Sequence, residues 1–330
     1  MLHFFFPTTR CAVQNRSWKN HIGGKMIGDM KTKKDMQMIH ITDSIAALLD
    51  REIKYEAQKV RSEIAPSLSA EDAVIDAKSN KYQDFRNILK FTCESGTPFT
   101  CNTRKSICRW MYKIVDIYSF ERNVVPIGMS YLDRYALKFP SDCSFRERCQ
   151  LVALASLYIA VKLHDVKRNG TLAFFAKISQ GCFTIYDIQN VEERILHGLD
   201  WLMNPPTPQS FLFVFVNLTS FIIPQFDPSL IKHIYEVANY VSELSFLHTA
   251  GNRTTASTLA CASFLIAVRE ANENIIPNGY KNAIVRRILS IALATEEEIA
   301  MLVDSIVSTI SNNTGCRLNL KQIFKVLAPS

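Results

Sequence analysis

The sequence predicts an all-α protein made of two tandem five-helix bundles behind an N-terminal helical extension. The stretch Gln150–Asp165 is apolar on nearly every side, and a helix of that kind belongs in the centre of a bundle. The pattern returns 107 residues later, where Ala262–Arg269 matches Ala155–Lys162 at five of eight positions. Two central helices of one design indicate two copies of one helical unit. Chance similarity between alanine-rich helices is the alternative.

Composition supports a packed helical protein and argues against several kinds of site. The 330 residues are 48% hydrophobic, which is enough for two domains that each bury a core. The formal net charge of +7 permits acidic partners but is weak evidence for nucleic acid. Nine cysteines with no C-x-x-C pair favour reduced and mostly buried thiols. We therefore expect no metal and no other cofactor.

Residues 1–80 are predicted to form an N-terminal extension that is partly disordered. Residues 1–40 show no sustained periodicity. An amphipathic helix is expected near 42–63, with Asp43 as its N-cap. Its apolar side carries Ile45, Leu48, Leu49 and Ile53. We expect this helix to be outlying and without a chemical role, and the small polar residues at 67–80 to form a linker.

Residues 81–204 are predicted to form the first bundle. A short helix at about 82–93 precedes five segments that are separated by turn residues. These five segments are about 103–121, 124–139, 144–164, 171–180 and 184–200. The stretch Asn204–Pro208 contains three prolines and ends the bundle, because proline lacks the N–H that a helix needs and restricts the residue before it.

Residues 205–315 are predicted to form the second bundle. Its five segments are about 208–221, 228–248, 253–271, 279–293 and 295–311. Thr295 and Glu298 have the spacing of a capping box at the start of the last segment. The tail, 316–330, carries a short helix near 320–327. No stretch alternates polar and apolar residues for long enough to predict a strand, and the apolar helices are too short to span a bilayer.

Four motifs occur in a definite order along the first bundle. Arg104 lies in the first segment, and Tyr131–Tyr135 in the second has the sequence Y-L-D-R-Y. Ala160–Lys162 ends the central helix, and Val191–Trp201 follows the pattern x-E-x-x-x-L-x-x-L-x-W in the fifth segment. In this order and spacing they resemble the cyclins, a family with two five-helix cyclin-box folds. The resemblance covers about 82–311, which is most of the chain.

The resemblance implies a protein with no catalytic residues of its own. The family's near-invariant positions hold the expected residues, which are Arg104, Asp133, Leu151, Lys162 and Glu192. It implies that Arg104 and Asp133 form a buried structural ion pair. It also implies that Lys162 and Glu192, together with Leu151, contact a cyclin-dependent protein kinase and favour its active conformer. Taken alone, a lysine at the end of an apolar helix is more often an ordinary surface residue.

The substrate-docking patch of the family is present only in a degenerate form. Ile107, Trp110 and Gln150 match it, but Thr103 replaces a methionine and Lys113 stands at the position of an acid. The family uses this patch for basic, leucine-bearing peptides, so these differences predict weakened or absent docking. The expected partners are a cyclin-dependent kinase, with kinase substrates or inhibitors as further candidates, and neither a membrane nor nucleic acid. The expected location is the nucleus, the cytoplasm or both.

Other functional classes remain open. A transcription-associated cyclin or a cyclin-fold transcription factor would share the double fold. Such a transcription factor also carries an N-terminal zinc ribbon, which Cys11 cannot form without a C-x-x-C pair. An all-α metal-dependent phosphohydrolase would use an adjacent His-Asp pair such as His164-Asp165. No histidine lies between His40 and His164, so a further metal ligand is missing, and we expect a solvated helix end there.

Overall fold

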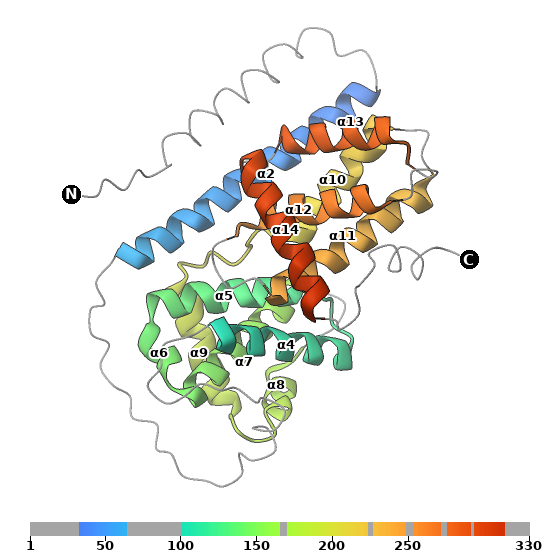
Figure 1. The fold of residues 1–330 in the computed structure, drawn as a ribbon. Coiled ribbons are helices and arrows are strands. Elements are labelled where there is room, and N and C mark those ends of the chain that lie inside the picture. Colours follow the sequence, from blue (N-terminus) through green and yellow to red (C-terminus); the bar gives the residue numbers. More distant parts are fainter. Residues whose placement is uncertain are drawn as a thin grey trace, which may run out of the picture.

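The computed structural model describes residues 33–64, 101–165, 170–223, 227–248, 254–271, 276–291 and 294–313. Every regular element in these ranges is a helix (Figure 1). The all-α prediction is therefore confirmed. The short helix expected at 82–93 and the tail helix expected near 320–327 lie outside the described residues. Among the described helices, none combines the length and the apolarity that crossing a bilayer requires.

The first bundle is arranged around one central helix, as the sequence predicts. Its helices are α4 (Cys101–Tyr118), α5 (Val124–Lys138), the short α6 (Pro140–Ser144), α7 (Arg146–His164), α8 (Leu172–Ile178) and α9 (Ile185–Gly198). Helix α7 packs against α5, α6, α8 and α9. All its residues from Cys149 to Val161 are buried, because a helix that is apolar all round has no side to turn to water.

Small side chains let α7 and α5 approach each other closely. Ala153, Ser156 and Ala160 on α7 are fully buried. Opposite them on α5 is Gly128, where a Cβ atom would lie 3.4 Å from the Leu157 Cα atom and 3.6 Å from the Ala160 Cβ atom. The face of small residues expected on this helix is thus an inter-helix contact.

The second bundle repeats this plan. Its helices are α10 (Pro208–Ile222), α11 (Pro228–His248), α12 (Ala256–Glu270), α13 (Asn278–Leu289) and α14 (Glu296–Asn313). Helix α12 is central and is buried from Leu259 to Val268. The capping box at the start of α14 is confirmed: the Thr295 N–H donates to Glu298 Oε2 at 2.8 Å, and the Glu298 N–H donates to Thr295 Oγ1 at 3.2 Å.

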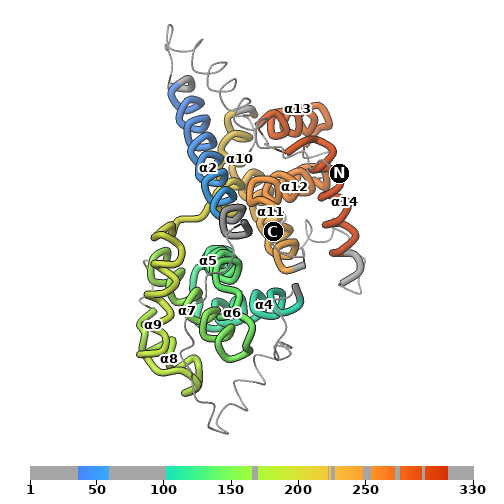
Figure 2. Tube along the Cα trace, turned by 90° about the vertical axis from the view of Figure 1, so that its left-hand side faces the viewer, coloured from blue at the N-terminus to red at the C-terminus, as the bar shows by residue number. Residues whose placement is uncertain are grey.

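Helix α2 (Lys33–Ile64) lies along the second bundle and reaches the first (Figure 2). It packs on α10, α12 and α5, so the expectation of an outlying helix was wrong. Ile45, Leu48 and Leu49 belong to the core of the second bundle, with Met38 and Ile41 packed against it. These last two residues continue the helical row of apolar positions upstream. The helix therefore starts at Lys33, and Asp43 lies inside it rather than at its N-cap.

Polar residues in the second half of α2 connect both bundles. Glu52 is buried and accepts hydrogen bonds from the backbone N–H of Ser257, at 2.8 Å, and from its hydroxyl group. Ser257 lies in the first turn of α12, where backbone N–H groups lack partners within the helix. Gln58 donates to Leu199 O at the end of α9 and accepts from the guanidinium of Arg134 on α5.

We expect the substitution Glu52→Ala to lower the free energy of unfolding by about 1–3 kcal/mol, because it leaves the first turn of α12 without a buried acceptor. Urea denaturation followed by circular dichroism, which reports helix content, measures the change in the free energy of unfolding. Lys54→Ala, on the exposed side of the same helix, is the control and should change the value by less than about 0.5 kcal/mol. Equal effects of the two substitutions would contradict the bridging role of α2.

Candidate functional site

Lys162 and Glu192 lie side by side on the first bundle. Lys162 is in the last turn of α7, and Glu192 is in the middle of α9. The Lys162 Nζ and Glu192 Oε1 atoms are 2.9 Å apart, which makes a charge-assisted hydrogen bond. The two residues that the sequence singled out, thirty positions apart, are therefore brought together by the fold.

The two side chains differ in exposure. The side chain of Lys162 is 50% exposed, whereas that of Glu192 is only 11% exposed. The hydrogen bond to Glu192 raises the pKa of Lys162, although partial burial acts in the opposite direction. The ammonium group also lies 5.5 Å from the centre of the Tyr158 ring, within reach of a cation–π interaction. The expectation that both side chains point outward holds for the lysine, while the carboxylate is mostly covered.

The local structure explains why this pair is held in place. Helix α9 begins with a capping box in which Thr184 Oγ1 accepts from the Asp187 N–H at 3.1 Å and Asp187 Oδ2 accepts from the Thr184 N–H at 2.8 Å. Lys162 lies at the C-terminal end of α7, where the helix dipole favours a cation. Both partners thus come from well-fixed parts of the bundle.

Exposed apolar side chains occur on the same two helices. Leu163 is 45% exposed next to Lys162, and Ile185 and Tyr186 in the first turn of α9 are 45% and 70% exposed. Large apolar side chains exposed beside a polar pair are typical of a surface that another protein covers. The arrangement is suited to the binding of another protein.

Arg104 and Asp133 form a buried ion pair between α4 and α5. The Arg104 Nε atom lies 3.0 Å from both carboxylate oxygens, and its Nη2 atom lies 2.9 Å from Asp133 Oδ2. Both residues are less than 9% exposed. The Arg104 guanidinium also lies 5.0 Å from the centre of the Phe246 ring on α11. One arginine thus connects two helices of the first bundle with a helix of the second.

Four other predicted site residues offer little surface. Leu151 is 5% exposed and belongs to the core of the first bundle, because all sides of α7 are covered there. Its expected contact with a kinase is therefore not available to its side chain. Ile107, Trp110 and Gln150, the residues of the degenerate docking patch, are at most 6% exposed. The patch consequently has almost no accessible apolar area.

His164 and Asp165 both make hydrogen bonds within the fold. Asp165 is 4% exposed and accepts a hydrogen bond from the backbone N–H of Glu121 at 2.9 Å. His164 Nε2 lies 3.0 Å from both the Tyr131 hydroxyl and Met203 O. The expectation of a solvated helix end was therefore wrong for Asp165, because its carboxylate is buried and bonded to the backbone of Glu121. Within the described ranges, no three His, Cys, Asp or Glu residues converge as metal ligands would.

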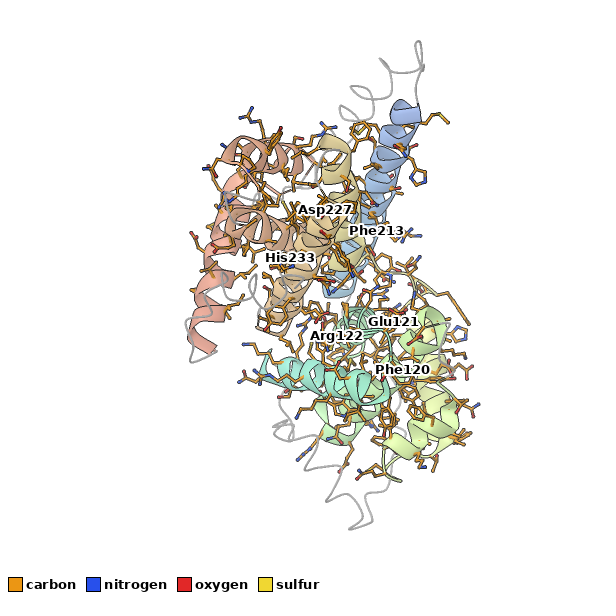
Figure 3. The ribbon with its side chains drawn as sticks, turned by 90° about the vertical axis from the view of Figure 1, so that its right-hand side faces the viewer. Phe120, Glu121, Arg122, Phe213, Asp227 and His233 are labelled. Carbon is orange, nitrogen blue, oxygen red and sulfur yellow. The ribbon has the colours of Figure 1, made fainter. Side chains whose placement is uncertain are left out.

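Two contacts of the bundle interface were not predicted from the sequence. Arg122 pairs with Glu243 on α11 at 2.8 Å and also with Asp116; Figure 3 shows it where the two bundles meet. Arg134 is 2% exposed and donates to Gln58 and to Leu202 O in the connection between the bundles. Burial lowers the pKa of Arg134 to about 10. Only Arg134 had a sequence signal, its place beside Asp133.

The second bundle does not reproduce the Lys162–Glu192 pair. Arg269 occupies the place of Lys162 at the end of its central helix and is exposed. Helix α14 starts with its own capping box at Thr295. Eight residues after this N-cap comes Val303, where the first bundle has Glu192 eight residues after Thr184. In the described part of the chain Arg269 has no ion pair, so the site exists in one copy.

The sequence is similar to proteins that are named as cyclins. Residues 76–204 match the family model described as the cyclin N-terminal domain. Cyclin-D3-3 of Arabidopsis thaliana is 31% identical over 120 residues, which is 36% of this chain and 33% of that relative. The G1/S-specific cyclin-E of Drosophila melanogaster is 27% identical over 115 residues, which is 35% of this chain and 16% of that relative. The matched part thus spans a third or less of the length of these relatives.

The fold also has a counterpart among solved structures. The X-ray structure of a viral cyclin from herpesvirus saimiri matches with a TM-score of 0.51 and 19% sequence identity. The match covers 78% of this chain and 96% of the viral protein. The two-bundle architecture is therefore the cyclin-box fold, as the resemblance implied.

We expect Asp133→Ala to lower the free energy of unfolding by about 3–5 kcal/mol, because it leaves the charge of Arg104 buried without its partner. Chemical denaturation of the purified protein measures this. Asp116→Ala is the control: it removes an acid of similar type from a pair in which both side chains are about half exposed, and it should cost about 1 kcal/mol or less. A mild effect of Asp133→Ala would mean that the buried pair is not a main support of the fold.

Proposed function

We propose that the chain is a cyclin, as its sequence matches indicate, and that it is a non-catalytic regulatory subunit that binds and activates a cyclin-dependent protein kinase. Control of the cell cycle is its proposed role, in the nucleus, the cytoplasm or both. One relative is named a G1/S-specific cyclin, which supports this role. The observation that carries the proposal is the Lys162–Glu192 pair, in which the lysine is half exposed, with exposed apolar side chains on the same two helices.

The proposed mechanism is a shift between two kinase conformers. A protein kinase transfers phosphate only when its strand lysine, the glutamate of its C-helix and its metal-binding aspartate are all in place. A partner that binds the conformer with the C-helix swung in raises the population of that conformer in proportion to its preference. Here the exposed ammonium of Lys162 would donate to main-chain carbonyl groups of the kinase, while the apolar residues around it supply buried area.

The free site is already arranged for specific binding. Lys162 is already held by Glu192 at 2.9 Å, so little side-chain freedom remains to be lost when a partner binds. The covered carboxylate fixes the direction of the ammonium group. Leu163, Ile185 and Tyr186 then form an apolar border on the same helices. Polar groups at such a site set the register of the complex, and apolar groups provide most of its stability.

We expect the double substitution Lys162→Ala with Glu192→Ala to leave the protein folded and to abolish kinase activation. Removing both charges avoids a covered carboxylate without a partner, which Lys162→Ala alone would leave behind. Kinase activity toward a protein substrate, measured with the kinase that co-purifies with the wild-type chain, tests this. The identity of that kinase also distinguishes a cell-cycle cyclin from a transcription-associated one.

Arg269→Ala is the matched control, because Arg269 ends the central helix of the second bundle as Lys162 ends that of the first. It should activate the kinase as the wild type does. Undiminished activation by the double variant would show that the pair is not part of the kinase-binding site.

We propose further that the protein has lost the docking of basic, leucine-bearing peptides. Ile107 and Trp110 are buried, and Lys113 on the exposed side of α4 repels a basic peptide. Isothermal titration with such a peptide should give no measurable heat at micromolar concentrations. A dissociation constant in the micromolar range would contradict this. The variant Lys113→Glu separates the two causes: binding that appears only in this variant identifies charge repulsion, and continued absence of binding identifies burial of the patch.

A further inference from the structure

We propose that the exposed face of α4 binds an acidic segment of a second polypeptide through a cationic row of Lys105, Arg109 and Lys113. The three residues are spaced four apart, so they follow one another along a single side of the helix. Arg109 and Lys113 are exposed and Lys105 is partly exposed. Helix α4 lies on the outside of the first bundle, at its front in Figure 1 and at its right in Figure 2, and the exposure of Arg109 and Lys113 leaves this side open to a partner.

The cationic row has no counter-charge within the described part of the protein. No acidic side chain there lies within ion-pair distance of any of its three members, while the nearby Asp116 is engaged by Arg122. Elsewhere the chain uses the opposite pattern, as in the Lys232–Glu236 pair of α11, where unlike charges stand four residues apart at 3.7 Å. The row therefore differs from an ordinary solvated face, in which charges of both signs alternate.

This arrangement is unfavourable for the isolated chain. Like charges four residues apart on a helix repel each other, and the row contains two such pairs. Lys105 is also only one turn from the N-terminal end of α4, where the helix dipole disfavours cations, and the first turn contains no acidic residue to offset it. An anionic partner would remove both penalties at once.

The spacing indicates the form of the partner. Residues four apart on a helix are separated by about 6 Å along its axis, and alternate residues of an extended chain are separated by about 6.6 Å. Acidic side chains at every second position of an extended segment can therefore face the three cations in turn. Ile117 is 68% exposed one turn beyond Lys113, so the segment also has a place for one apolar side chain. The partner is thus an acidic peptide segment with an apolar residue at one end.

A synthetic peptide with glutamate at every second position, threonine between, and leucine at one end is the probe. It should bind the full chain, and its affinity should fall as salt rises, because the contacts are exposed ion pairs. The variant Lys105→Glu with Arg109→Glu and Lys113→Glu should weaken binding about tenfold or more. The control Lys54→Glu with Arg269→Glu and Arg286→Glu, which changes the net charge equally at exposed sites elsewhere, should bind as the wild type does.

The single variant Arg109→Glu separates a binding role from a structural one. It turns two repulsive pairs into two attractive ones, so the melting temperature should rise by about 1–3 °C, while peptide affinity falls. If the cationic row had only a structural role, Arg109→Glu would stabilise the protein without weakening the binding of the peptide.

Three outcomes would overturn the proposal. They are no binding of the peptide, equal loss of binding in the control variant, and binding of anionic phospholipid vesicles through the row without binding of the peptide. A phosphoserine version of the peptide distinguishes the two sources of negative charge: stronger binding than the glutamate peptide identifies a phosphorylated segment, and equal binding identifies carboxylates. Neither result depends on kinase binding at Lys162.

Discussion

The buried contact of Arg104 with Asp133 and Phe246 is the interaction on which the arrangement of the molecule depends. Two charges that are less than 9% exposed can remain buried only when they satisfy each other. Their pairing fixes α4 against α5, and the stacking of Phe246 brings α11 of the second bundle to the same point. Arg122 and Glu243 add a second contact between the bundles at the other end of α4. Phe246 packs against both cores, so this side chain, the polar contacts and α2 together join the bundles.

The central position of α7 explains why the Lys162–Glu192 pair can form at its end. From Cys149 to Val161 the helix is enclosed by its neighbours, and Gly128 brings α5 close to it. Lys162 is the first residue after this enclosed stretch whose side chain reaches solvent. A rigid helix thus positions a long side chain, and Glu192 on the adjoining α9 limits its direction. The precision of the site comes from the packing behind it, which is the usual way in which binding residues are held.

Much of the fold follows from the sequence, and the site follows only in part. The apolar periodicity and the prolines at 204–208 were enough to predict ten of the helices within a few residues, because these signals act locally. The position of α2 was missed, since Met38 and Ile41 looked like part of an aperiodic stretch until the second bundle supplied a surface for them. The covering of Glu192 and the pairing of Arg122 with Glu243, 121 residues apart, depend on tertiary contacts that no local pattern records.

The two bundles differ in the residues that they place at the end of the central helix and on the fifth helix, and the surroundings of these residues explain the difference. The first copy presents Lys162 with a carboxylate beside it. The second keeps a cation at Arg269, but at the corresponding place on α14 it has Val303, which is 8% exposed and packs in the core. A carboxylate at Val303 would be buried among apolar side chains without a partner, whereas the equally covered Glu192 is paired with Lys162. The second copy instead contributes Glu243 and Phe246 to the junction. The first copy therefore carries the exposed lysine, while the second holds the first bundle in place through α11.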